Sequence, residues 1–236
     1  MKKEVISSER NTSQLKNRNI KYIVLHYTAG KTSKAGAAAA NAQYYAGGDR
    51  QASADFFVDD GGIVQYNPDI HNRYTWHCGG TKNKYTKGGS LNGICRNANS
   101  IGIEICSNLK PCGSPTANSG DYYFSEATLQ NAAELIAELA LEYDIEPENI
   151  VRHYDVTGKL CPGIIGWNED SGSVGAYVRF KAMVALKMEE KSTPEISPWA
   201  AEAWAWAKNK GITDGTRPKD TVTREELVTM LYRAQK

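Results

Sequence analysis

Tyr22-Ile23-Val24-Leu25-His26 is a short, almost wholly apolar stretch that ends in a histidine. A continuous apolar run of this length predicts a buried strand, here over Lys21–Leu25. A polar side chain at the end of a buried strand lies at a sheet edge, where side chains from neighbouring strands converge on a cleft. The run therefore predicts a strand of the main sheet and, in His26, a candidate site residue at its end.

A second predicted strand, over residues 100–106, alternates in polarity. Ile101, Ile103 and Ile105 would face one side of it, and Gly102, Glu104 and Cys106 the other. A carboxylate inside an apolar strand is costly unless it is paired or functional, and burial raises its pKa toward neutrality. Glu104 is therefore a candidate for proton transfer. The alternative is a salt bridge to a nearby lysine or arginine.

Helices and strands alternate along the rest of the main body. The expected helices cover residues 34–45, 125–143 and 174–188, and the further strands cover residues 56–58, 63–66 and 150–153. Residues 1 to about 20 are polar and are expected to form a loose lead-in, and residues 78–99 a long surface loop. Strands mixed with amphipathic helices predict an α/β domain with a mixed central β-sheet flanked by helices.

Length and charge limit the class of protein. The 236 residues suffice for one full domain and a small second one, and 41% of them are apolar. A formal net charge of +1, from 28 basic and 27 acidic side chains, gives no reason to expect a nucleic-acid partner. No apolar run approaches the roughly 20 residues of a membrane span, so membrane insertion is not expected. No apolar stretch follows the basic start, so no secretory signal is expected either.

A change in composition divides the chain toward its C-terminal end. Residues 188–197 are charged, contain Pro194 and are followed by Pro198, which is typical of a linker. We therefore expect a main domain over residues 1–187 and a small segment over residues 198–236. The small segment predicts two helices joined by the turn Gly211–Thr216, and a segment of this size seldom holds a core alone.

His153 and Cys161 are candidate partners of His26 at a metal site. His153 follows the short strand predicted near residue 150, and the turn at Pro162 can bring the Cys161 thiol back toward it. Two imidazoles and a thiolate suit zinc, and three protein ligands leave a fourth position for a reacting water. The alternative is two core histidines and a buried thiol. The other four cysteines are expected to be free thiols in a reducing cytoplasm: Cys78, Cys95, Cys106 and Cys112.

Lys159 stands two positions before Cys161 and so lies close to any metal held there. Its ammonium group could donate to an oxyanion that develops during a reaction. The alternative for Lys159 is an ordinary solvated lysine in a loop.

Three segments together resemble the motifs of a known enzyme family. They are Val24-Leu25-His26-Tyr27-Thr28, Ser100-Ile101-Gly102-Ile103-Glu104 and His153-Tyr154-Asp155-Val156-Thr157-Gly158-Lys159-Leu160-Cys161-Pro162. In them the chain is similar to zinc-dependent N-acetylmuramoyl-L-alanine amidases. These type-2 amidases are related to peptidoglycan recognition proteins and to amidase-type phage lysins. The likeness covers roughly residues 20–187, and the third motif is the most specific.

The resemblance implies a role for each of five residues. His26, His153 and Cys161 would bind zinc. Glu104 would match the family's catalytic carboxylate, and Lys159 its catalytic lysine. Recognition proteins that bind without cutting often lack the thiolate, so Cys161 favours an enzyme. The implied reaction is hydrolysis of the amide between N-acetylmuramic acid and L-alanine in bacterial peptidoglycan.

Candidate substrate contacts lie around these motifs. They are Tyr27, Thr28, Trp76, His77 and the loop over residues 78–99. Aromatic faces suit sugar rings, and Trp76-His77 resembles a Trp-His pair at the family's substrate groove. Some members also place a tyrosine near the metal, where this chain has Ala54 and Asp55. A mechanism that depends on that tyrosine is therefore not expected here, which favours Glu104.

Residues 198–235 resemble a single S-layer homology motif. The likeness lies in Trp199-Ala200-Ala201-Glu202-Ala203-Trp204, Gly211-Ile212-Thr213-Asp214-Gly215-Thr216 and Thr223-Arg224-Glu225-Glu226. It implies attachment to a secondary cell-wall polymer of Gram-positive bacteria, either weakly or through a homo-oligomer that gathers three motifs. The alternative is a helical tail of the catalytic domain. An amidase with a wall-binding tail resembles a phage or prophage endolysin, made in the cytoplasm and released through holin pores.

Three other classes compete with this hypothesis. A non-catalytic peptidoglycan-binding module would keep the groove without cutting, but Cys161 and Glu104 serve hydrolysis more than binding. A structural zinc protein would close the site with a fourth protein ligand, for which Cys78, Cys106 or His77 could serve. A zinc peptidase of the His-Glu-x-x-His type is not indicated, since that motif is absent.

Overall fold

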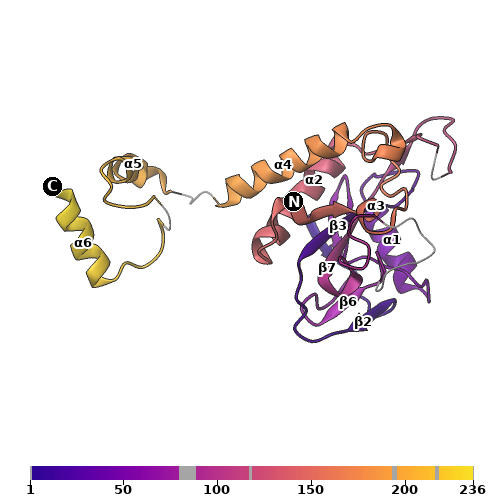
Figure 1. Cartoon of the computed structure of the whole chain (residues 1–236), viewed down its shortest axis with the longest axis horizontal. Coiled ribbons are helices and arrows are strands. Elements are labelled where there is room, and N and C mark those ends of the chain that lie inside the picture. Colours follow the sequence, from indigo (N-terminus) through magenta and orange to yellow (C-terminus); the bar gives the residue numbers. More distant parts are fainter. Residues whose placement is uncertain (1, 80–88, 117–118, 193–195, 216–217, 236) are drawn as a thin grey trace. The chain divides into compact units, whose positions relative to one another are not determined.

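The computed structural model describes residues 2–79, 89–116, 119–192, 196–215 and 218–235. The chain forms two compact units, Met1–Met188 and Glu189–Lys236. Each unit is described by itself below, and Figure 1 labels the α-helices and some of the strands.

The first unit contains ten strands and four α-helices among its described residues. The strands are β1 (Lys2–Val5), β2 (Thr12–Gln14), β3 (Tyr22–Tyr27), β4 (Phe56–Asp59), β5 (Gly62–Gln65), β6 (Arg73–Thr75), β7 (Ser100–Ile105), β8 (Asn108–Leu109), β9 (Tyr122–Tyr123) and β10 (Ile150–Arg152). The helices are α1 (Ala37–Ala46), α2 (Glu126–Glu142), α3 (His153–Thr157) and α4, which begins at Gly175 and continues to Ser192.

Six strands form the main sheet, in the order β1-β5-β4-β7-β3-β10. Only the β4–β5 hairpin is antiparallel, and the other neighbours in this sheet run parallel. β3 therefore lies between β7 and β10. Figure 1 labels the neighbouring strands β3 and β7. The predicted mixed α/β class is confirmed.

The two faces of the sheet are covered by different helices. α2 and α4 pack on one face, where Ile101, Ile103 and Ile105 of β7 lie in the main core. α1 covers part of the other face by packing on Phe57 of β4. Val24 of β3 faces this second side and joins a small cluster beneath α3. Since side chains alternate along a strand, His26 and Glu104 share this second face with Val24.

Three expectations about the main unit were wrong. Residues 1–20 are not a loose lead-in, because β1 pairs in parallel with β5 and β2 pairs with β6. The strand expected over residues 150–153 ends at Arg152, and His153 begins α3 instead. α4 continues to Ser192, beyond the end at residue 188 that was predicted for this helix. The loop expected over residues 78–99 lies partly outside the described residues.

The second unit contains α5 (Ala201–Asn209) and α6 (Arg224–Ala234), as predicted. Thr223 caps α6 by accepting a hydrogen bond from the Glu226 amide, with the Glu226 carboxylate accepting in return. Large apolar side chains stay exposed on this unit, with Trp199 88% and Val228 65% accessible. Across the described residues, every helix is too short or too polar to cross a membrane.

Candidate metal centre and active site

His26, His153 and Cys161 come together at one point. One ligand atom from each lies within 4.8 Å of those of the other two. His26 Nδ1 is 3.7 Å from Cys161 Sγ, and the ring centroids of His26 and His153 are 4.7 Å apart. Tetrahedral zinc, with Zn–N of about 2.0 Å and Zn–S of about 2.3 Å, separates a nitrogen and a sulfur ligand by roughly 3.6 Å. The observed spacing matches that value.

Local structure explains how each ligand reaches this point. His26 stands near the end of β3, and His153 is the first residue of α3. The turn from β10 into α3 is fixed by Asp155, whose carboxylate accepts from the Arg152 amide at 2.7 Å and pairs with its guanidinium at 2.6 Å. Gly158 then ends α3 at a φ of 75°, a left-handed conformation that glycine adopts without strain. The amide of Tyr154 donates to the Cys161 carbonyl at 3.0 Å, which returns the chain to His153.

The donor set fits a zinc ion on two further grounds. His153 Nδ1 is buried without a hydrogen-bond partner in the part of the chain that the structure describes, as expected of an atom that faces a cation. Among the described residues, one group of at least three His, Cys, Asp or Glu side chains could hold a metal ion, and it consists of His26, His153 and Cys161. Three protein ligands leave a fourth position for substrate or water, as in catalytic zinc sites.

Burial controls the protonation of the three ligands. It raises the pKa of the Cys161 thiol to about 12, with the nearby Glu104 charge adding to the shift. It also lowers the pKa of His153 to about 3, helped by Lys159, and lowers the pKa of His26 well below its usual value. Both imidazoles are therefore neutral near pH 7, the form that binds metal. The thiol needs a cation to become a thiolate.

Glu104 is next to the ligands on the neighbouring strand. It is paired with His26 in the β3–β7 register, and its Oε2 atom is buried without a hydrogen-bond partner among the described residues. Burial raises its pKa to about 7, although the Lys159 charge opposes this shift. The salt bridge considered as the alternative is not present, since none of the ion pairs of the described residues includes Glu104. A carboxyl group with a pKa near 7 can both accept and release a proton.

Lys159 lies in the loop between α3 and Cys161 and is exposed to solvent. Its positive charge lowers the pKa of His26, Glu104 and Cys161, which places its ammonium group within electrostatic range of the site. A mobile cation at the rim of a metal site can reach a developing oxyanion.

Two predicted substrate contacts lie away from open surface. Tyr27 is 7% exposed, belongs to the main core and packs edge-on against Tyr122 with 5.7 Å between ring centroids. Its ring therefore offers little surface to a sugar. Thr28 is partly buried, and its Oγ1 accepts from the amides of Gly30 and Ser107 at 3.2 and 3.3 Å. The hydroxyl of Thr28 thus holds the turn after β3.

Trp76 and His77 follow β6 and have different neighbours. The Trp76 indole donates to Ser13 Oγ at 2.9 Å, which ties it to β2. His77 Nδ1 lies 3.1 Å from His26 Nε2, so His77 contacts a candidate metal ligand. The sequence marked His77 through the Trp-His resemblance and as a possible fourth ligand of a structural zinc site, but it did not indicate a contact with Nε2 of His26. His77 does not complete the metal site, because it faces the ring nitrogen of His26 opposite to the one near Cys161.

Comparison with known proteins places this fold and site in a family. A family profile described as N-acetylmuramoyl-L-alanine amidase matches residues 16–164. That range includes His26, Glu104, His153, Lys159 and Cys161, and it covers more than half of the chain. The chain therefore belongs to the N-acetylmuramoyl-L-alanine amidase family.

Individual relatives are bacterial amidases. The chain is 33% identical over 191 residues to the N-acetylmuramoyl-L-alanine amidase BlyA of Bacillus subtilis (strain 168), covering 78% of this chain and 46% of that protein. It is also 33% identical over 216 residues to a probable N-acetylmuramoyl-L-alanine amidase of Bacillus licheniformis, covering 89% and 54%. The chain thus spans about half the length of these relatives.

Solved structures show the same fold over most of the chain. The catalytic domain of XlyA superposes with a TM-score of 0.51 at 30% identity, covering 77% of this chain and 99% of that one. A mutant endolysin from Bacillus subtilis superposes with a TM-score of 0.52 at 29% identity, covering 78% and 99%.

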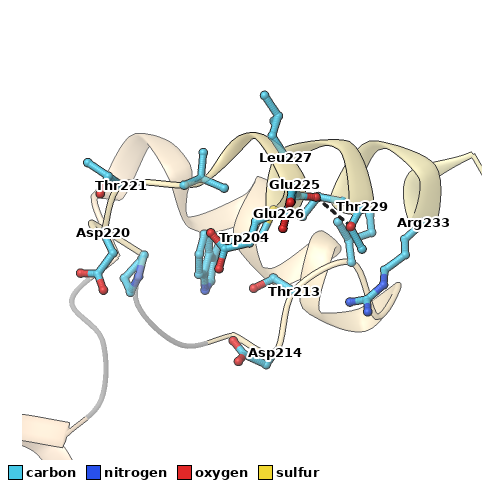
Figure 2. A pocket seen from close by; sticks show the side chains of 14 residues that line it. Trp204, Thr213, Asp214, Asp220, Thr221, Glu225, Glu226, Leu227, Thr229 and Arg233 are labelled. Atoms are coloured by element: carbon cyan, nitrogen blue, oxygen red, sulfur yellow. Dashed lines mark hydrogen bonds between the residues drawn. The ribbon is translucent and has the colours of Figure 1, made fainter.

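The second unit contains a pocket of its own, of about 620 Å³. Figure 2 shows the side chains around it. They include one aromatic ring, several carboxylates and hydroxyls, and one guanidinium: Trp204, Thr213, Asp214, Asp220, Thr221, Glu225, Glu226, Thr229 and Arg233. The family profile ends at residue 164 and does not extend to this unit.

Proposed function

We propose that this chain is a zinc-dependent hydrolase of the amide bond between N-acetylmuramic acid and L-alanine in peptidoglycan. One observation carries the proposal: a three-residue His/His/Cys group that could hold a metal has beside it a carboxylate with a buried, unpaired oxygen among the described residues, in a chain of the amidase family. His26, His153 and Cys161 would hold the zinc ion. When bound, zinc supplies a Lewis acid that polarises the scissile carbonyl and acidifies a water molecule.

The chain's own groups would move the protons and stabilise charge. Glu104, with a pKa raised to about 7, would take a proton from the attacking water and later give it to the departing L-alanine amine. Lys159 would donate to the oxyanion that forms on the former carbonyl. Cys161 and Glu104 together favour this hydrolase over a non-catalytic binding module, since binding alone needs neither a thiolate nor a neutral-range carboxyl group.

We also propose that the protein acts as an endolysin. The relatives include a chain described as an endolysin from Bacillus subtilis, which supports this role. Release from the producing cell would then depend on holin-type pores.

The products of digestion test the reaction directly. Purified peptidoglycan incubated with the protein should gain free L-alanine amines without new reducing sugars. A chelator should stop the reaction, and added zinc should restore it. New reducing ends without new amines would indicate a glycosidase and would contradict the proposal.

For the second unit we propose binding to a secondary cell-wall polymer. The pocket around Trp204 supports this, because an aromatic ring among carboxylates and hydroxyls suits a sugar. In the full chain carrying Glu104→Gln, Trp204→Ala should weaken co-sedimentation with purified walls. Trp206→Ala, at a half-exposed tryptophan outside the pocket, is the matched control. Equal binding by the two variants would remove this role. Binding could also depend on a homo-oligomer that gathers three copies of the C-terminal motif. Sedimentation velocity over a range of concentrations tests for this oligomer.

A further inference from the structure

His77 belongs to a chain of hydrogen bonds that ends at a metal ligand. His26 Nε2 lies 3.1 Å from His77 Nδ1, and His77 Nε2 lies 3.2 Å from Ser100 Oγ. Ser100 Oγ in turn lies 2.6 Å from the carbonyl oxygen of Arg96. The ring of His77 thus connects a fixed backbone acceptor to His26.

The direction of this chain follows from its far end. A carbonyl oxygen only accepts, so the single hydroxyl hydrogen of Ser100 points to Arg96. Ser100 Oγ then accepts from His77 Nε2–H. A neutral imidazole carries one hydrogen, so His77 Nδ1 is an acceptor and His26 Nε2 must donate to it. That arrangement leaves the lone pair of His26 Nδ1 facing Cys161 Sγ, 3.7 Å away.

The protein holds His77 in this position from two sides. The amides of His77 and Cys78 both donate to Asn97 Oδ1, at 3.0 and 2.7 Å. The imidazole lies against β7 at Gly102, where an added Cβ would come within 2.6 Å of the ring. Asp55 fixes the same glycine by accepting from its amide at 2.7 Å. Only glycine leaves room for the ring at this point of the strand.

We propose that His77 is a positioning residue for the metal centre, which sets the tautomer and orientation of His26 so that Nδ1 is free to bind zinc. This inference rests on the proposed zinc site. It assigns His77 to the support of a ligand instead of to the substrate. Partners of this kind typically contribute 10- to 100-fold to metal affinity (an order-of-magnitude range).

Zinc affinity of the full-length protein, measured by competition with a chromophoric chelator, tests the proposal without using activity. His77→Leu should weaken zinc binding by roughly 10- to 100-fold. His77→Asn keeps an acceptor near the position of Nδ1 and should retain most of the affinity. His71 lies on an exposed turn and is the one histidine of the chain other than His26, His77 and His153. The control variant His71→Leu should bind zinc like the parent. Equal affinities of the parent and His77→Leu would overturn the proposal.

The tautomers themselves give a second readout that needs neither a variant nor zinc. Two-bond ¹H–¹⁵N correlation spectra of the metal-free parent should place the ring hydrogens of His26 and His77 on Nε2. A hydrogen on Nδ1 of either ring would refute the inference. If the parent itself does not bind zinc, the proposed function is wrong. If the parent binds zinc and His77→Leu binds it equally well, only the role proposed for His77 is wrong.

Discussion

His26 on β3 and Glu104 on β7 are register partners on adjacent parallel strands, and both face the α3 side of the sheet. His26 belongs to a His/His/Cys group that could hold a metal ion, and Glu104 is a carboxyl group with an unpaired buried oxygen among the described residues. Backbone hydrogen bonding in the sheet therefore sets the spacing between His26, the proposed metal ligand, and Glu104, the proposed proton-transfer group. Rigid elements hold a site more accurately than loops do.

Replacement of Cys161 should separate ligand chemistry from packing. Cys161→Ala should lose zinc and activity together, because two imidazoles alone hold zinc weakly. Cys161→Asp restores an anionic zinc ligand and should recover part of the bound metal. Metal content by mass spectrometry and release of amines from peptidoglycan provide the two readouts. An active, zinc-replete Cys161→Ala protein would show that the thiolate is not a ligand.

Glu104→Gln should retain zinc but lower turnover by about 10²- to 10⁴-fold, the usual contribution of a general acid–base group. The amide keeps the shape of the side chain and cannot carry the proton. Glu146→Gln, at an exposed glutamate, is the matched control and should be as fast as the parent. Initial rates of amine release measure the effect. A Glu104→Gln enzyme with parental rates would exclude the acid–base role.

Lys159→Ala should also retain zinc and should slow turnover by about two orders of magnitude, as expected when one oxyanion donor is lost. Lys159→Arg preserves the charge and should be less impaired. Lys31→Ala, at another exposed lysine, should leave the rate unchanged. If Lys159→Ala has the parental kcat, its charge does not act on the transition state.

The buried Glu104 carboxyl should make the stability of the metal-free protein depend on pH. Its folded pKa is raised from 4.5 to about 7, so the native state holds this proton more tightly than the unfolded chain does. The resulting stabilisation is complete below about pH 4.5 and is lost as the pH rises through about 7. Its size is on the order of 3 kcal/mol. Urea unfolding of the metal-free parent should show this loss, and Glu104→Gln should show less of it. Parallel pH profiles for the two proteins would contradict the assignment.

Gly102→Ala tests whether the space on β7 serves the metal site. The new methyl group would meet the His77 ring at 2.6 Å and should displace it from His26. Zinc affinity should fall although no ligand has changed. Gly175→Ala, where an added Cβ meets only ordinary contacts, is the control. Unaltered zinc affinity in Gly102→Ala would mean that the ring adjusts without consequence.

The sequence predicted the main sheet because its signals are local. The alternation of Ile101, Ile103 and Ile105 placed β7 and assigned these three residues to one side of it, and the apolar run before His26 placed β3. β1 was missed because Lys2–Val5 is mostly polar, and its place in the sheet comes from backbone pairing with β5. α3 was missed because its first turn is set by the contact between Asp155 and Arg152.

The candidate site, like the fold, was predicted in part. The three ligands and Glu104 lie in motifs that a sequence shows. His77 was marked as a substrate contact and as a possible fourth zinc ligand, but its link to His26 Nε2 was missed because that link spans 51 positions and depends on the register of β7. Tyr27 was predicted to be a substrate contact, although alternation along β3 turns its ring into the core opposite His26.

X-ray absorption at the zinc edge of the metal-loaded, full-length protein tests the central claim most directly. We expect one sulfur ligand at about 2.3 Å, two imidazole nitrogens at about 2.0 Å and one light-atom ligand from solvent. The sulfur contribution should disappear in Cys161→Asp. A shell without sulfur in the parent, or one with four protein ligands, would contradict a catalytic centre built from His26, His153 and Cys161.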